Sequence, residues 1–302
     1  MNTEPIQFFN RYTETIEEEA IYGEPYLRWA YGTPLGRLTV QLIVKRLFFS
    51  HWYGWRMNQT GSRTRITPFL KQFGLDASEF EKKVDSFEHF NDFFSRKLRS
   101  ASRPVNSNEA SVVFPADGRH LGFQNLASIE GVFVKGQEFK LAELFHDDAL
   151  ATRYKEGTAI LSRLCPTDYH RFHFSTDGVP TEAKIVRGAL YSVSPLALRQ
   201  NLSYLWHNKR MITRLQSDTL GEVTIVEFGA TNVGSITQTF APNKPVKRGE
   251  EKGFFSFGGS ATMTFFEPGR ITLMSDLSEN SRSHRELYAR MGDTMATTIS
   301  QA

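Results

Sequence analysis

The chain has 302 residues, 40% hydrophobic and 23% charged, a mixture typical of globular proteins with one large domain or two smaller ones. The formal net charge of +3 is too small to indicate a nucleic-acid-binding protein, although it is compatible with an anionic membrane surface. Cys165 is the single cysteine, which excludes an internal disulfide and fits a reducing compartment.

The first 20 residues are acidic and lack an apolar core, unlike a secretory signal or a transit peptide. The sequence contains no run of about 18 apolar residues, so no transmembrane helix is predicted. We therefore expect any contact with a membrane to be made by a local surface segment.

Residues 1–105 predict a helical region that associates with a membrane. Within it, the stretch 35–55 combines apolar side chains near helical spacing with basic and aromatic residues, a mixture typical of a helix in the headgroup layer. The alternative is a core helix whose basic side chains extend to solvent. The basic residues are Arg37, Lys45 and Arg46, and the aromatic residues are Trp52, Tyr53 and Trp55.

Two further helices are predicted before the first region ends. They span 68–73 and 78–90, with Asp76 or Ser78 as a possible cap of the second helix. The polar stretch 99–108 contains Pro104 and is predicted to be a linker.

Residues 106–302 predict a second domain that is β-rich and mostly antiparallel, so the expected fold class is α+β. Short β-prone runs alternate with turn dipeptides such as Asp117-Gly118 and Pro268-Gly269. Short helices are expected at 141–150 and 195–201. The β-prone runs lie at 111–114, 183–187, 222–228, 234–239 and 261–266.

Three short segments carry reactive residue types: FPADG at 114–118, DYHRFH at 168–173 and FGGS at 257–260. A serine hydroxyl is a weak nucleophile until a base removes its proton, and a carboxylate can orient a histidine base. Asp117, His173 and Ser260 could form such a triad. Two glycines before Ser260 would allow close approach to the Gly259 carbonyl.

Each segment alone also has an ordinary interpretation, because Gly-Gly-Ser and Asp-Gly are common turn sequences. His170 and His173 could be metal ligands on a helix, but their neighbours predict a strand, where a spacing of three points to opposite faces. No metal site is therefore predicted. Cys165 fits a small buried apolar residue.

In combination, the three segments resemble the phosphatidylserine decarboxylase family, which has PADG, DYHRxH and (L/G)GS segments in this order. The resemblance covers about residues 85–297, and the FGGS form occurs in one branch of the family, whereas another has LGST. Further matching segments are FNDFFSRKLR at 90–99, RPV at 103–105, GATNVGSI at 229–236, KRGEEKGFFSFGGS at 247–260 and RMGDTMAT at 290–297.

The resemblance implies a proenzyme that makes its own cofactor. Ser260 would attack the Gly259 carbonyl and break the chain into residues 1–259 and 260–302, with Asp117, His173 and Ser260 as the processing triad. Residue 260 would become a covalent pyruvoyl group. An imine between this group and phosphatidylserine would allow loss of CO2 to give phosphatidylethanolamine.

His170 is the expected acid that returns a proton to the substrate carbon, unless it only orders the pocket. The two chains should stay together, because strands after Ser260 would pair within the sheet, and the resemblance suggests a homodimer. The expected location is peripheral, on the cytoplasmic face of a bacterial cell membrane.

Two other functions use the same residues differently. A lipid serine hydrolase could use Asp117, His173 and Ser260 on an external substrate, although the chain lacks a G-x-S-x-G elbow. A non-catalytic membrane-binding paralogue would be expected to have lost the serine or a histidine, and both are present. Only the decarboxylase interpretation requires cleavage at Gly259.

Overall fold

The computed structural model describes residues 5–21, 23–44, 52, 54–230, 236–258 and 260–299, and for 43 and 44 only the backbone. Part of the predicted membrane stretch, 45–51 and 53, lies outside the described residues. So do Gly259 and residues 231–235 of the GATNVGSI segment.

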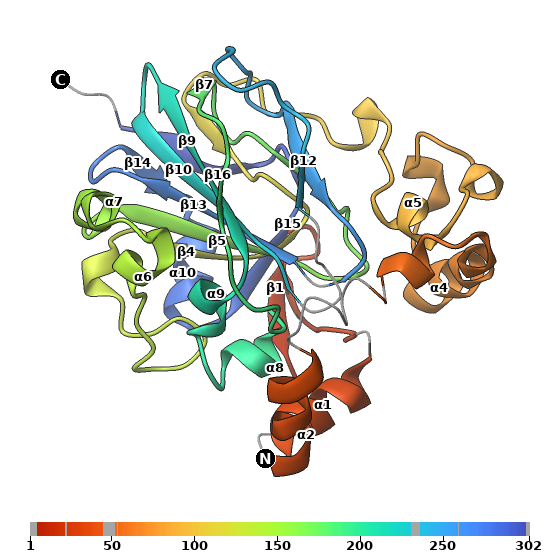
Figure 1. The fold of residues 1–302 in the computed structure, drawn as a ribbon. Helices are drawn as coiled ribbons and strands as arrows, with labels where there is room; N and C mark the ends of the chain where they lie inside the picture. The colour runs from red at the N-terminus through yellow and green to blue at the C-terminus, as the bar shows by residue number, and fades with distance from the viewer. Residues whose placement is uncertain are drawn as a thin grey trace.

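A ten-stranded sheet forms the centre of the molecule (Figure 1). Its order is β2-β1-β15-β4-β5-β13-β10-β9-β7, and β8 also pairs with β9. The strands are β1 (Gln7–Asn10), β2 (Thr15–Glu18), β4 (Gly118–Phe123), β5 (Thr158–Leu164), β7 (Val179–Pro180), β8 (Lys184–Val186), β9 (Arg210–Ser217), β10 (Gly221–Phe228), β13 (Ser260–Phe266) and β15 (Glu286–Ala289).

The central strands are rich in β-branched and aromatic residues, such as VTIVEF in β10 and ATMTFF in β13, which favour a pleated, buried surface. All pairings in this sheet are antiparallel except that of β1 with β15. The predicted antiparallel β region is therefore confirmed.

Two three-stranded sheets accompany the main one. The first has the order β11-β12-β6, with β6 at Arg171–His173, β11 at Ile236–Gln238 and β12 at Glu251–Phe255. The second has the order β14-β16-β3, with β3 at Ser111–Val113, β14 at Ile271–Leu273 and β16 at Thr294–Thr298. The first sheet carries His173, which is buried at the end of β6.

Short helices cover both faces of the main sheet. Apolar residues of one face, including Met263 and Phe265, pack with Leu144, Tyr154 and Leu205 from the helices. The opposite face packs against α10 and the β14-β16-β3 sheet. The helices are α6 (Leu141–Phe145), α7 (Asp148–Tyr154), α8 (Pro195–Leu198), α9 (Tyr204–His207) and α10 (Ser275–Arg282), with a 3-10 turn at Leu126–Ser128.

The prediction of a helical N-terminal region holds only in part. Strands β1 and β2 form a hairpin in the main sheet. The sequence gives no local sign of this because the partner, β15, lies near the other end of the chain. Helical structure follows in α1 (Glu24–Gly32), α2 (Pro34–Thr39) and a π-helical turn at Val40–Val44. Within the described part of the chain, no helix has the length and apolar composition needed to cross a bilayer.

A phenylalanine-rich cluster organises the described residues between 57 and 98. The predicted helix at 68–73 is confirmed as α4 (Ile66–Phe73), which follows a 3-10 segment at Thr60–Arg65. Buried phenylalanines of the cluster pack edge to face, including Phe69 on Phe90 and Phe80 on Phe87. A further 3-10 turn at Ser100–Ser102 lies in the predicted linker.

The predicted helix at 78–90 is wrong. Asp76 accepts a hydrogen bond from Ser78 N at 2.8 Å, but it caps only a 3-10 turn at Ala77–Glu79. Phe80 leaves this turn in extended conformation and pairs with Leu98, which ends the helical geometry. A second 3-10 turn spans Val84–Ser86, and the helix α5 begins only at Phe90 and ends at Phe94.

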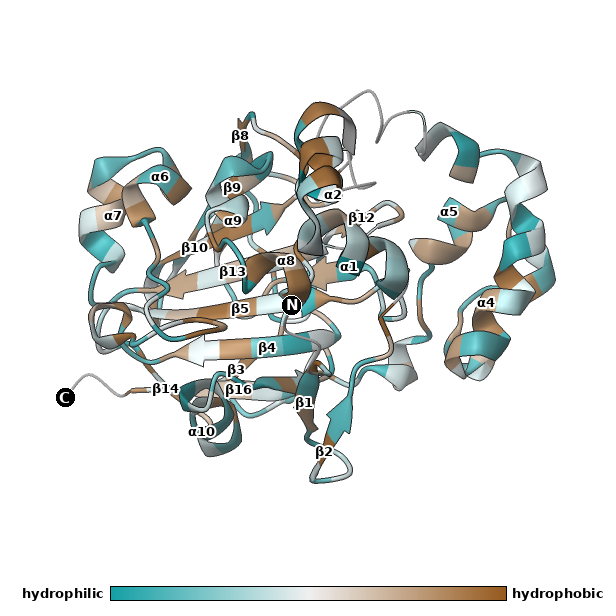
Figure 2. Cartoon of the chain, turned by 90° about the horizontal axis from the view of Figure 1, so that it is seen from below, coloured by the Kyte–Doolittle hydropathy of each residue, from teal (hydrophilic) through white to brown (hydrophobic). Residues whose placement is uncertain are grey.

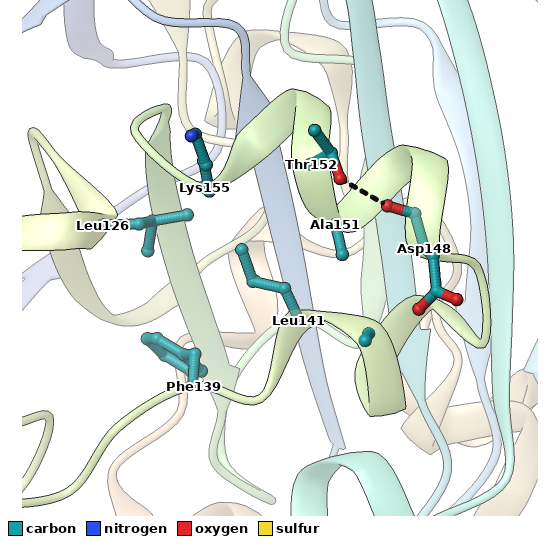
Figure 3. Close-up of a pocket in the computed structure, with 8 residues that line it drawn as sticks. Leu126, Phe139, Leu141, Asp148, Ala151, Thr152 and Lys155 are labelled. Carbon is teal, nitrogen blue, oxygen red and sulfur yellow. Dashed lines mark hydrogen bonds between the residues drawn. The ribbon is translucent and has the colours of Figure 1, made fainter.

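A cavity of about 460 Å³ lies beside α6 and α7 (Figure 3). Thr152 donates a hydrogen bond to the Asp148 carbonyl within α7, so that hydroxyl is used by the helix itself. None of the predicted site residues lines this cavity. Its lining is Leu126, Phe139, Leu141, Ala142, Asp148, Ala151, Thr152 and Lys155.

Candidate active site

Ser260 is the first residue of β13, a strand flanked by β5 and β10 in the middle of the main sheet. Its partner in β5 is Leu164, and its side chain is fully buried. Ser260 Oγ lies 3.2 Å from His170 Nδ1. The structure therefore joins two of the predicted site residues, one from each of two separate segments.

The second ring nitrogen of His170 determines what this contact can do. His170 Nε2 lies 2.8 Å from the carbonyl oxygen of Cys165. A carbonyl can only accept, so Nε2 carries the proton of the neutral ring and Nδ1 is left to accept from the Ser260 hydroxyl. The geometry is that of a base beside a nucleophile.

The surroundings of His170 keep its ring neutral. The ring is fully buried and stacks on Phe94, with 3.9 Å between ring centroids. Burial, and then the positive charge of Arg96, lower the pKa of His170 to about 3, although the hydrogen bond to Cys165 opposes this change. At neutral pH the His170 ring is therefore uncharged, and Nδ1 keeps the lone pair that accepts from the Ser260 hydroxyl.

Asp168 shapes the turn that presents the Cys165 carbonyl. Its carboxylate accepts from Cys165 N at 2.7 Å, while its own N–H donates to Cys165 O at 2.8 Å. Arg119 Nη1 lies 2.7 Å from both oxygens of the carboxylate. Burial raises the pKa of Asp168, and Arg119 opposes the rise. Asp168 thus positions His170 through the Cys165 carbonyl.

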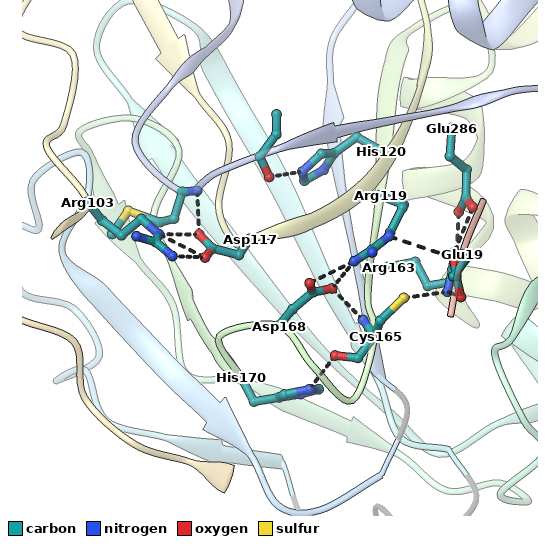
Figure 4. A network of polar contacts seen from close by, with 12 residues as sticks. Glu19, Arg103, Asp117, Arg119, His120, Arg163, Cys165, Asp168, His170 and Glu286 are labelled. Carbon is teal, nitrogen blue, oxygen red and sulfur yellow. Dashed lines mark hydrogen bonds and ion pairs between the residues drawn. The ribbon is translucent and has the colours of Figure 1, made fainter. Parts of the chain in front are cut away.

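This turn is connected to a larger buried network of charges (Figure 4). Arg163 pairs with Glu286 at 2.7 Å and with Glu19, which follows the β1-β2 hairpin. Burial would raise the pKa of Glu19, but Arg163 and Arg119 outweigh it and hold that pKa at about 2. Each buried charge in this network therefore has an opposite charge beside it, as burial requires.

Asp117 lies between two parts of the chain. Its carboxylate accepts from Arg103 Nε at 2.8 and 2.9 Å and from Met291 N at 2.9 Å. Gly118 follows it, and a Cβ there would come 2.5 Å from the Arg163 carbonyl oxygen. Only glycine allows this close approach of the first residue of β4 to β5.

His173 ends β6, and His170 lies directly before this strand, so the predicted strand includes only the second of the two histidines. Its Nδ1 lies 3.3 Å from the Pro115 carbonyl oxygen, and its backbone N–H donates to the same oxygen at 2.8 Å. Burial lowers the pKa of His173 to about 4, while Glu251, Pro115 and Asp117 oppose the change. The PADG segment is therefore held at Pro115 by His173 and at Asp117 by Arg103 and Met291.

The predicted triad is only partly joined by these contacts. Among the described residues, no hydrogen bond links His173 to Ser260 or to Asp117; the histidine that contacts Ser260 is His170. The triad assignment stays a prediction. Sequence reasoning missed the supporting residues Phe94, Arg103, Arg119 and Asp168. Three of them lie in segments already noted, FNDFFSRKLR, RPV and DYHRFH, but their roles depend on contacts that the sequence does not contain.

Comparison with known proteins agrees with these motifs. The model of the phosphatidylserine decarboxylase family matches residues 90–297. A phosphatidylserine decarboxylase proenzyme of Fusobacterium nucleatum subsp. nucleatum is 40% identical over 293 residues, 97% of this chain and 98% of that protein. Proteins of the same name from Clostridium botulinum (strain Eklund 17B / Type B) and Desulfitobacterium hafniense (strain Y51) are 42% and 39% identical, over 97% and 95% of this chain and 99% and 97% of their own lengths.

Proposed function

Because the chain belongs to the phosphatidylserine decarboxylase family, we propose that it is a proenzyme that cleaves itself between Gly259 and Ser260 before it acts on lipid. The mature protein is a carboxy-lyase that removes CO2 from phosphatidylserine and gives phosphatidylethanolamine. The contact between Ser260 Oγ and His170 Nδ1 is the observation that carries the proposed cleavage site.

The proposed cleavage starts at the Ser260 hydroxyl. His170 Nδ1 takes the hydroxyl proton while Oγ bonds to the Gly259 carbonyl carbon, and the amide nitrogen leaves with a proton. The product is an ester between residue 259 and the Ser260 side chain. Loss of the α-proton of residue 260 then expels the Gly259 carboxylate, which ends the chain 1–259. The dehydroalanine that remains takes up water and loses ammonia to give a pyruvoyl group.

The environment of residue 260 fits that group. It is fully buried at the start of a central strand, so pairing with β5 and β10 would hold the new terminus in place. The pyruvoyl carbonyl supplies an electron sink as CO2 leaves the substrate. His170 Nδ1, 3.2 Å from Ser260 Oγ, is a position from which a proton could be returned to the substrate carbon.

The same strand order supports association of the two chains after cleavage. The chain 260–302 would contain β13, β14, β15, β16 and α10. Strand β13 pairs on both sides with strands of the chain 1–259, and Asp117 accepts from Met291 N across the two chains. Cleavage at one peptide bond leaves all these hydrogen bonds in place.

We also propose that the N-terminal helices bind the membrane peripherally. Leu35, Leu38 and Leu42 are exposed on α2 and the turn after it, and Trp55 is 61% exposed. Figure 2 shows apolar residues along α2, which packs on α1, and α1 in turn packs on α8. The exposed basic residues Arg37 and Arg56 are suited to anionic headgroups. An insoluble lipid substrate requires such a contact.

The test is the intact mass and activity of the purified parent protein and of Ser260→Ala. The parent should consist of chains 1–259 and 260–302, with no free amine at residue 260. Ser260→Ala should stay one chain and form no phosphatidylethanolamine, because alanine has no hydroxyl to attack. An active parent with an intact chain would contradict the proposal, and lipid-ester hydrolysis by that intact chain would favour the serine hydrolase instead.

A further inference from the structure

Helix α5 packs against the segment that leads to the cleavage site. The ring of Phe257 meets Phe90 and Phe94 edge to face, with centroids 5.1 and 4.9 Å apart. Phe257 is 2% exposed, although it lies only three residues before Ser260. The approach to the cleavage site is therefore anchored in the phenylalanine cluster.

Asn91 fixes the backbone of the same segment. Its Oδ1 accepts a hydrogen bond from Phe257 N at 2.8 Å, and its Nδ2 donates to Asn58 Oδ1 at 2.7 Å. Asn91 is 7% exposed, so its amide groups depend on such partners. Because the Phe257 N–H can only donate, the oxygen of the Asn91 amide faces it, and the amide nitrogen is left to donate to Asn58.

The two residues between Phe257 and Ser260 are glycines, which restrict the backbone conformation less than other residues do. Gly258 has φ +139°, in the region that favours glycine, and residue 259 is also glycine. A segment of two glycines has many accessible conformations, so its course must be set by contacts on either side. Strand β13 fixes the far side, and Phe257 fixes the near side.

The same helix also positions the base. Phe94 stacks on His170, while Asn91 holds Phe257 one turn earlier on α5. We propose that Asn91 is a positioning residue for self-cleavage, which holds the backbone before Gly259 so that the scissile carbonyl comes within reach of Ser260. This inference rests on the proposed cleavage at Gly259–Ser260 and names a residue that acts through Phe257.

The experiment compares precursor conversion in three variants made by cell-free synthesis and followed by gel over time. Asn91→Leu keeps the size of the side chain but removes the acceptor, so we expect cleavage at least about tenfold slower than in the parent, as for a misplaced reacting group. Asn91→Asp keeps an oxygen toward Phe257 N, and the Asn58 amide can turn to donate to it. This variant should cleave within about threefold of the parent.

Ser62→Ala is the matched control. Ser62 Oγ accepts from Phe90 N at 2.9 Å and donates toward the Met57 and Gln59 carbonyl oxygens. This variant therefore also removes buried hydrogen bonds between a side chain and the backbone, but it keeps the hydrogen bond from Phe257 N to Asn91. It should cleave within about threefold of the parent. Thermal unfolding of each variant, measured with Ser260→Ala to prevent cleavage, shows whether the two losses destabilise the fold equally.

Slow cleavage of Asn91→Leu, with near-parental cleavage of the other two variants, supports the inference. Asn91→Leu at the parental rate, or Ser62→Ala as slow as Asn91→Leu at equal stability, overturns it while leaving the proposed function intact. A parent that is not cleaved between Gly259 and Ser260 overturns the proposed function and this inference together.

Discussion

Two regions of the molecule differ in which side chains they bury. The interior around Ser260 buries charged and polar groups, whereas the N-terminal helices expose apolar ones. Around Ser260, the chain fully buries His170 and almost fully buries the charged groups of Arg163 and Glu286. On the N-terminal helices, Leu35 and Leu38 are 65% and 53% exposed. One region takes charges out of water, and the other leaves leucines in it.

The leucines are exposed although the helices have a core to pack against. The inner side of the same helices is packed: Tyr31 and Val40 are buried against Tyr191 and Ala197 beside α8. Within the ranges that the structure describes, this short helical segment therefore has two apolar surfaces, and only one of them is covered by other residues of the chain. The exposed apolar surface is suited to contact with a lipid bilayer, whereas the buried polar groups around Ser260 are suited to proton transfer.

The first prediction distinguishes the two histidines of the interior. His170→Ala removes the group that contacts Ser260 Oγ, so self-cleavage should slow by up to about 10⁴-fold, the upper range for loss of a general base. His173→Ala loses a hydrogen bond to Pro115 and should slow cleavage less. Conversion of newly made precursor, followed by gel, measures both rates.

The reverse order, with His173→Ala the slower variant, would restore the predicted triad of Asp117, His173 and Ser260. Folding must be checked separately, because each substitution opens space in the core. Near-ultraviolet circular dichroism of the uncleaved variants provides this control. Equal rates for both variants and the parent would remove histidine from the mechanism.

The second prediction concerns the N-terminal helices alone. Replacing Leu35, Leu38 and Trp55 together with serine should weaken adsorption to anionic vesicles by about 10³-fold, because each side chain loses about 1.5 kcal/mol or more of burial in the lipid interface. Self-cleavage should persist, since none of the three contacts the residues around Ser260. Vesicle co-sedimentation and a gel of the two chains measure the two effects.

A matched control replaces exposed apolar residues elsewhere. Ile16, Val134 and Ile299 are 50%, 37% and 43% exposed and lie outside the N-terminal helices. Their triple serine variant should sediment with vesicles like the parent. If both triple variants lose adsorption equally, the membrane contact is not specific to α2 and its neighbours.

The sequence locates the candidate reactive residues but does not contain their contacts. Ser260, Asp117 and the two histidines stand in segments of distinctive composition, and the strands around them have alternating or continuous β-prone runs. The pairing of His170 with Ser260 could not be predicted, because it depends on the turn at Cys165–Asp168 and on Phe94 from a distant helix. The hairpin β1-β2 was missed because its pairing with β15 has no local pattern.

The third prediction concerns the stability of the buried interior in acid, and its expected effect is the smallest of the three. Burial is the main cause that lowers the pKa of His120 to about 3, as it does for His170 and, to about 4, for His173. His120 lies outside the proposed chemistry: its Nδ1 is 2.9 Å from Ser162 Oγ and its Nε2 is 3.2 Å from the Ala289 carbonyl oxygen. A substitution of His120 therefore tests the effect of a buried histidine without altering a residue that contacts position 260.

The sign of the effect follows from the direction of these shifts. Between about pH 4 and pH 6.5, the three histidines are neutral in the folded protein but gain protons in the unfolded chain, so the free energy of unfolding falls as the pH is lowered through this window. His120→Gln removes one of the three. The slope of stability against pH should therefore decrease by about 1.4 kcal/mol per pH unit at most, the value for one proton.

Urea unfolding of Ser260→Ala with and without His120→Gln, at several pH values in this window, measures the slope. Ser162→Ala is the control, because it removes the hydrogen-bond partner of His120 Nδ1 and leaves the titrating ring in its buried site. It should lower stability by a similar amount at every pH. A slope that His120→Gln leaves unchanged would mean that this histidine is already protonated in the fold, and that burial next to Phe114 does not exclude its charge.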